Sequence, residues 1–128
     1  MIEGVGQVII EVGDQDRALE FWTNSVGFEL TRDAPYGEGR RWIEVTTRDR
    51  AIVLVLSLRR GGGSTAPEEL PTSNIFFYCD DLPRTHEELS ARGVVFPQPP
   101  IEQPWGWWSM FEDLEGNRFA LVPRSSLS

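Results

Sequence analysis

The residues most able to do chemistry in this sequence are two glutamates and a set of aromatic side chains. Glu11 and Glu44 each lie in a segment with the alternating pattern of a β-strand. Tryptophan faces attract cations and stack on planar rings, so either carboxylate could pair with a positive group on a ligand that the rings also hold. Packing in a core or a dimer explains the aromatic residues equally well. They are Trp42, Phe76, Tyr78, Trp105, Trp107 and Trp108.

Other catalytic chemistry is poorly represented. His86 and Cys79 are the single histidine and the single cysteine, which excludes a Cys/His zinc cluster and an internal disulfide framework. His86 stands among acidic residues in a helical pattern and is expected on the surface. Gly61–Gly63 lacks the lysine and the following helix of a phosphate-binding loop, and no nucleophile–base–orienter triad can be assembled.

Length and charge limit the class of protein. A chain of 128 residues with 40% hydrophobic content suits one domain over residues 1–128. The formal charge of −8 repels phosphate backbones, so we expect no nucleic-acid partner and a preference for cationic ligands. No run is long and apolar enough for a membrane span, and the first residues lack a secretory pattern, so a cytoplasmic protein with no membrane partner is expected.

The elements that would position these residues follow from periodicity and turn residues. Helices are expected over about Gln15–Val26, after the N-cap Asp14, and over Leu82–Arg92, after the N-cap Asp81. Alternating segments predict the strands Gln7–Val12, Phe28–Thr31, Arg41–Thr46, Ala51–Leu58, Asn74–Cys79, Val94–Phe96, Trp107–Glu112 and Arg118–Val122.

This order of elements occurs twice. Gln7 and Asp14 recur as Asn74 and Asp81, about 67 residues later, and Gly27 recurs as Gly93. Residues 61–72 have the composition of a linker. The sequence therefore predicts an α+β fold of two βαβββ modules with mixed sheets, the first over about 1–60 and the second over about 73–124.

Strand alternation then assigns faces. Val8, Ile10 and Val12 should lie under a helix, which turns Gln7, Ile9 and Glu11 to the other face. The same rule separates the helix-facing residues Ile43, Val45, Ile75, Phe77, Cys79, Phe119 and Leu121 from Trp42, Glu44, Thr46, Asn74, Phe76, Tyr78, Arg118, Ala120 and Val122. Mixed aromatic, amide, carboxylate and guanidinium groups on the second set favour a small-molecule site. We expect ligand contacts from Gln7, Ile9, Glu11, Trp42, Glu44, Asn74, Phe76, Tyr78, Trp105, Trp107, Arg118 and Ala120.

The stretch Gln7–Leu30 resembles the opening module of the vicinal oxygen chelate superfamily, which includes glyoxalase I, extradiol dioxygenases and bleomycin-resistance proteins. The resemblance continues through Asp80–Leu82 and Ala91–Gly93 to Pro104–Gly106 and Glu112–Asn117. It implies the cupped glyoxalase/bleomycin-resistance fold, and it implies a homodimer.

The resemblance also implies four metal-ligand positions, which match Gln7, Glu44, Asn74 and Ala120. Ala120 has no donor atom, and a neutral amide such as Asn74 binds transition metals poorly. We therefore expect no metal and no other cofactor.

Two functions stay open. The first is a metal-free protein that binds and sequesters a small aromatic or cationic compound, as bleomycin-resistance proteins do in antibiotic resistance. The second is an enzyme: a metal-dependent lyase or dioxygenase, or a metal-free isomerase with Glu44 as catalytic base and Tyr78 or Arg118 as electrophilic partner.

Overall fold

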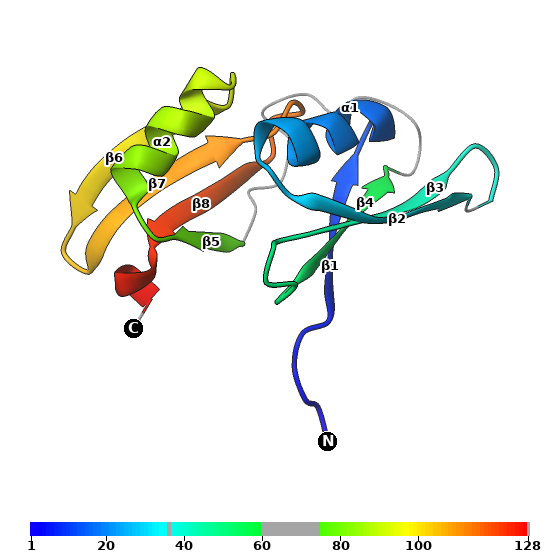
Figure 1. Ribbon diagram of the computed structural model, residues 1–128, viewed down its shortest axis with the longest axis horizontal. Coiled ribbons are helices and arrows are strands. Elements are labelled where there is room, and N and C mark those ends of the chain that lie inside the picture. Colours follow the sequence, from blue (N-terminus) through cyan, green and yellow to red (C-terminus); the bar gives the residue numbers. More distant parts are fainter. Residues whose placement is uncertain (36, 60–74, 128) are drawn as a thin grey trace. The chain divides into compact units, whose positions relative to one another are not determined.

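The computed structural model describes residues 1–35, 37–59 and 75–127, and it divides the chain into two compact units. Unit 1 spans Met1–Ser64 and unit 2 spans Thr65–Ser128. In each unit an α-helix lies on one face of a four-stranded mixed sheet (Figure 1). This confirms the predicted α+β fold of two βαβββ modules. The predicted linker, 61–72, lies outside the described residues.

Unit 1 has the strand order β1-β4-β3-β2. β1 pairs with β4 in parallel, and the other neighbours are antiparallel. Its elements are β1 (Gln7–Val12), α1 (Gln15–Glu20), η1 (Phe21–Ser25), β2 (Glu29–Pro35), β3 (Arg41–Thr46) and β4 (Val53–Leu58).

The predicted helix over about Gln15–Val26 is present, but its second half is not α-helical. η1 is a π-helix, in which the amide of Val26 donates to the carbonyl of Phe21 at 3.0 Å. Phe21 and the adjacent Trp22 are both buried. The wider turn of a π-helix brings consecutive side chains closer to one face, so both rings can enter the core.

α1 is fixed to the sheet by one buried polar side chain, that of Gln15. Its Nε2 donates to the carbonyls of Arg41 at 2.6 Å and Leu56 at 2.8 Å, and its Oε1 accepts from the amide of Arg41 at 3.1 Å. Nearby, the guanidinium of Arg41 also binds the carboxylates of Asp16 and Asp33. These contacts join the start of the helix to β2, β3 and β4.

Unit 2 repeats the order as β5-β8-β7-β6, with β5 and β8 parallel. β6 is longer than the predicted strand 94–96 and continues through Pro97, Pro99 and Pro100. Among the described strands β6 pairs with β7 alone, and proline is tolerated on an edge strand. The elements are β5 (Phe76–Cys79), α2 (Leu82–Ala91), β6 (Val95–Gln103), β7 (Gly106–Glu112), β8 (Arg118–Pro123) and η3 (Arg124–Leu127).

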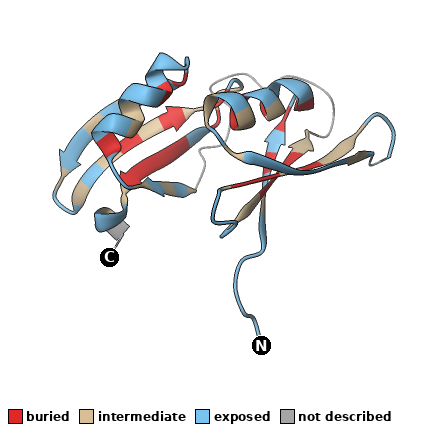
Figure 2. Cartoon of the chain, viewed as in Figure 1, coloured by how far each residue is buried: buried red, intermediate tan, exposed pale blue. Residues whose placement is uncertain are grey.

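The predicted division into faces is confirmed for the strands of unit 1. We call the side of each sheet that packs on the α-helix its helix face and the opposite side its open face. Ile10, Val12, Ile43, Val45, Leu54 and Leu56, on the helix face, are at most 5% exposed. Gln7, Ile9 and Glu11, on the open face, are exposed (Figure 2). Thr46, Ala120 and Val122 are buried although they lie on open faces.

The turn between β7 and β8 is built around a buried carboxylate. Asp113 Oδ1 accepts from the amides of Glu115 and Asn117, each at 2.9 Å, and Oδ2 accepts from Nδ2 of Asn117 at 2.9 Å. Burial raises the pKa of Asp113, against the lowering effect of these hydrogen bonds. The predicted turn over residues 113–117 is therefore a hydrogen-bonded structural element.

Within the described ranges, no helix has the length and apolar character that crossing a bilayer would require.

Candidate functional site

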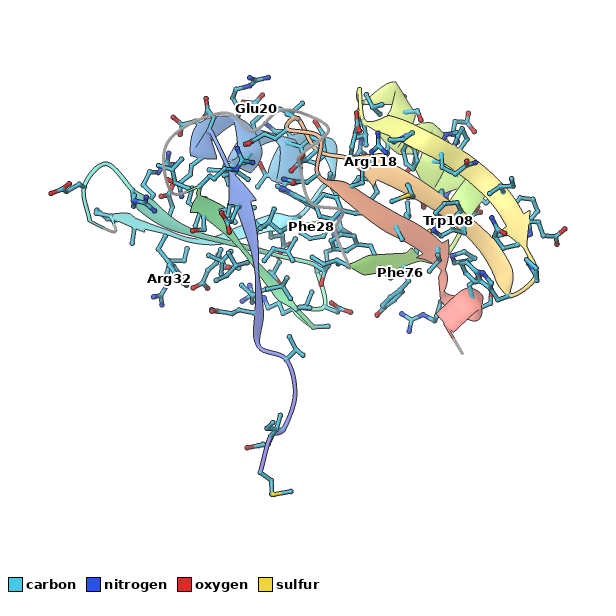
Figure 3. The ribbon with its side chains drawn as sticks, turned by 180° about the vertical axis from the view of Figure 1, so that it is seen from behind. Glu20, Phe28, Arg32, Phe76, Trp108 and Arg118 are labelled. Atoms are coloured by element: carbon cyan, nitrogen blue, oxygen red, sulfur yellow. The ribbon has the colours of Figure 1, made fainter. Side chains whose placement is uncertain are left out.

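Glu44 is the centre of the polar group on the open face of unit 1. Strand register places Ile9, Val55, Glu44 and Arg32 in one row across β1, β4, β3 and β2. Residues that face each other across paired strands point to the same side of a sheet. Figure 3 shows Arg32 on the side of the sheet away from α1, whereas Glu20 lies on the side of α1.

The carboxylate of Glu44 is held through one oxygen. Its Oε2 accepts from Nε1 of Trp42 at 2.6 Å and from Nε2 of Gln7 at 3.4 Å. Nε of Arg32 lies 3.9 Å from the same oxygen, and the arginine side chain is 63% exposed. In the part of the chain that the structure describes, Oε1 takes part in no hydrogen bond or ion pair. The glutamate side chain keeps 15% of its surface exposed.

The contact between Trp42 and Glu44 is local in the sequence, whereas that of Gln7 is not. Trp42 and Glu44 are two residues apart on β3, so strand alternation places both on the open face, where the indole reaches the carboxylate. Gln7 comes from β1, which lies beyond β4 in the sheet, and its longer contact spans that strand. Glu11 lies further along β1, opposite Ser57, and is exposed.

The open face of unit 2 carries aromatic and apolar residues. Phe76, Ala120, Met110 and Gln98 form one row across β5, β8, β7 and β6. Phe76 is 53% exposed. This row corresponds, position by position, to the row that contains Glu44 in unit 1.

Two arginines near this face, Arg118 and Arg124, interact with other side chains of unit 2. Nε of Arg118 lies 3.5 Å from Oε2 of Glu112. The guanidinium carbon of Arg124 in η3 sits 4.4 Å from the ring centroid of Tyr78, a cation–π contact. The aromatic surface of unit 2 therefore already has a cation against it.

The structure brings some of the predicted site residues together and separates others. Gln7, Trp42 and Glu44 are in contact, and Ile9 lies in the row of Glu44. Trp107 is on the helix face, because Ser109 and Phe111 of the same strand pair with the buried Leu121 and Phe119. Trp105 precedes β7 in an exposed turn. Asn74 lies outside the described residues.

Three residues of the open faces were not among the expected ligand contacts, although Trp108 was named with the aromatic residues. Arg32 lies next to Glu44 across β2 and β3. It was missed because the predicted strand Phe28–Thr31 ended before it, whereas β2 runs to Pro35 with a register shift between Leu30 and Arg32. Trp108 and Met110 lie on the open face of β7. Arg118 was assigned to the open face, and the predicted turn 113–117 places Glu112 opposite it. Alternation back along β7 from Glu112 then puts Met110 and Trp108 on the same face.

The metal-ligand set implied by the resemblance does not fit these residues. Ala120 on β8 corresponds to Val55 on β4, since they oppose the equivalent residues Phe76 and Ile9. The assignment of Glu44, on β3, to the second ligand position therefore departs from the repeat, and Val55 has no donor atom either. Among the described residues, no three His, Cys, Asp or Glu side chains could hold a metal ion together.

The fold of two βαβββ units and its open sheet faces define a class that comparison with known proteins identifies. A model of the Glyoxalase/Bleomycin resistance protein/Dioxygenase superfamily matches residues 4–121. The chain belongs to this superfamily, which confirms the resemblance found in the sequence.

Three similar proteins illustrate the match. YetH of Bacillus subtilis is 33% identical over 124 residues, covering 94% of this chain and 98% of YetH. A superfamily member from Sphaerobacter thermophilus is 30% identical with a TM-score of 0.83, covering 96% and 98% of the two chains. TnmS3, an antibiotic binding protein from Streptomyces sp. CB03234, is 31% identical with a TM-score of 0.79, covering 95% and 96%.

Proposed function

We propose that this protein binds a small cationic molecule with an apolar or aromatic body, and that it does so without a metal and without transforming the ligand. The observation that carries the proposal is the carboxylate of Glu44, which is mostly buried yet, among the described residues, makes its hydrogen bonds and ion pair through Oε2 alone. A carboxylate taken out of water is costly unless it is well paired. Arg32 is largely exposed and pairs with it only at Oε2, 3.9 Å away, so a ligand cation at Oε1 would add a closer pair.

The surroundings suit a ligand with an apolar part. Ile9, 60% exposed, lies one strand beyond Val55 in the row of Glu44, and Trp42 adds an indole on the same face. Apolar side chains around a few fixed polar groups are typical of small-molecule sites. The net charge of −8 attracts cations toward the protein as a whole.

The similarity to TnmS3, described as an antibiotic binding protein, supports binding without turnover. Absence of a metal is supported by the donor set, in which neither Ala120 nor Val55 has a donor atom. We also propose that the protein is a homodimer, as the family resemblance implies, and that it acts in the cytoplasm, as its sequence pattern suggests. Light scattering on a size-exclusion column would test the dimer.

The test of the function is a screen of aromatic amines and aromatic carboxylic acids by calorimetry, on protein purified without chelators or a metal-affinity tag. We expect binding of amines that Glu44→Gln removes, while Glu20→Gln, on the other side of the sheet, leaves it unchanged. Binding of only the acids, or binding unaffected by Glu44→Gln, contradicts the proposal. Stoichiometric metal by elemental analysis, or product formation by mass spectrometry, would contradict its metal-free and non-catalytic parts.

A further inference from the structure

We propose that the site at Glu44 selects ammonium cations, primary to tertiary, over guanidinium and amidinium cations, and that Trp42 sets this selectivity. The inference rests on the proposed function, because it names the chemical class of cation that the same carboxylate takes. It follows from which of the two carboxylate oxygens is already in use.

Oε2 of Glu44 has little remaining capacity. It accepts from the Trp42 indole at 2.6 Å and from the Gln7 amide at 3.4 Å, and Nε of Arg32 lies 3.9 Å away. An ionised carboxylate offers about four lone-pair positions on its two oxygens, about two on each. Trp42 and Gln7 fill those of Oε2, which leaves Oε1 for a ligand.

The two classes of cation need different numbers of oxygens. A guanidinium or amidinium group binds a carboxylate best through two parallel N–H bonds, one to each oxygen. An ammonium group is a compact charge that needs a single oxygen. A carboxylate with one open oxygen therefore gives the ammonium its full interaction and the guanidinium only half of its preferred one.

Trp42 controls this difference. Its indole makes the shorter of the two hydrogen bonds to Oε2, and indole nitrogen is a donor only. Trp42→Phe keeps an aromatic ring on the open face but removes the donor, so Oε2 becomes available to a ligand. Gln7→Met removes the second, longer hydrogen bond from an exposed position on β1 and serves as an independent variant.

The experiment compares two probes with the same body, 2-phenylethylammonium and 2-phenylethylguanidinium, by calorimetry at one pH and ionic strength. A hydrogen bond to a charged group is worth enough to change affinity about tenfold. We expect the wild-type protein to prefer the ammonium probe by about five- to tenfold. Trp42→Phe should reduce that ratio toward one by improving binding of the guanidinium probe, Gln7→Met should reduce it less, and Glu20→Gln should not change it.

Each outcome separates this inference from the proposed function. Equal affinity for both probes, or preference for the guanidinium, with both lost in Glu44→Gln, overturns the inference and leaves the proposed function standing. An ammonium preference unchanged in both Trp42→Phe and Gln7→Met, checked as folded by urea unfolding, overturns the role of the occupied oxygen. Failure of the wild-type protein to bind either probe counts against the proposed function and the inference together.

Discussion

The open face of unit 1 has the row Ile9, Val55, Glu44 and Arg32, whereas the same row of unit 2 has Phe76, Ala120, Met110 and Gln98. Glu44 and Met110 occupy equivalent places in these rows. Each has a tryptophan two positions earlier on its own strand, Trp42 on β3 and Trp108 on β7, so the two sheets share a register. They differ in that a carboxylate and a guanidinium occupy the first row and neutral side chains occupy the second.

The two units resemble each other more on their helix faces and at the starts of their helices than on their open faces. Asp14 and Asp81 both cap their helices by accepting from a backbone amide three residues on, at 3.0 Å. Packing and capping constrain those positions in both units, because each sheet must bury a helix. The open face has no such constraint from the unit's own core, so the row of Glu44 can carry charged groups in unit 1 and the equivalent row of unit 2 can carry neutral ones.

The largest expected difference between the units concerns their turns. Asp113→Ala removes a buried acceptor from three donors and should lower the free energy of unfolding by about 3 kcal/mol. Asp49, in the turn between β3 and β4, is exposed, and Asp49→Ala should cost less than about 1 kcal/mol. Urea unfolding of both variants measures this, and equal losses would show that burial of the turn carboxylate is unimportant.

The second prediction compares two glutamates on open faces. Glu44→Gln should weaken binding of an aromatic amine by about tenfold to a hundredfold, because a charged partner at Oε1 is lost. Glu112 is already paired with Arg118, so Glu112→Gln should change the affinity by less than about twofold. Calorimetry of both variants checks the contrast, which would disappear if the amine bound on unit 2.

The third prediction compares how the two helices are attached. Gln15 follows the cap of α1 and makes three hydrogen bonds to the sheet, while Leu82 follows the cap of α2 and is buried without them. Gln15→Leu copies unit 2 but leaves buried backbone groups unpaired, so it should destabilise the fold by about 2 kcal/mol. Glu20→Leu, on the exposed side of α1, is the control and should stay within about 0.5 kcal/mol in urea unfolding.

The fourth prediction concerns the positive charge in the row of Glu44. Arg32 is largely exposed and lies 3.9 Å from Oε2, so it competes weakly with a ligand cation. Arg32→Gln should therefore strengthen amine binding by about two- to fivefold, with a larger gain at low salt. Gln98 already occupies the equivalent position of unit 2. A titration at two salt concentrations tests this, and weaker binding would mean that Arg32 contacts the ligand.

The smallest expected effect is a difference in pH response. A bidentate hydrogen bond from Arg41 lowers the pKa of Asp33 below its ordinary value of 3.8, with burial opposing the shift. A lowered pKa contributes stability above the unfolded value that is lost as the pH falls through the folded value. Asp33→Asn should lower the free energy of unfolding by less than about 1 kcal/mol at neutral pH, and should not change it below the folded pKa of Asp33, as measured by urea unfolding at several pH values. The raised pKa of Asp113 acts in the opposite direction. The stability linked to protonation of its carboxyl group is present at low pH and is lost as the pH rises through the folded pKa.

Much of the fold could be predicted because its signals are local. Alternation placed Ile43 and Val45 under the helix, and the aspartate caps and stop glycines located both helices. The repeat then showed that the two halves share one topology. The length of β6 was missed because proline disfavours pairing locally, and only the position of β6 at the edge of the sheet makes those prolines acceptable.

The composition of the site depended on register as well as on pattern. The sequence by itself determined that Gln7, Trp42 and Glu44 share a face, since side-chain direction alternates along every strand. Only the tertiary structure decided that Gln7 and Trp42 converge on one oxygen of Glu44 and that Arg32 joins them across a register shift. The register of strand pairing fixes those contacts, both between the consecutive strands β2 and β3 and between the distant strands β1 and β4.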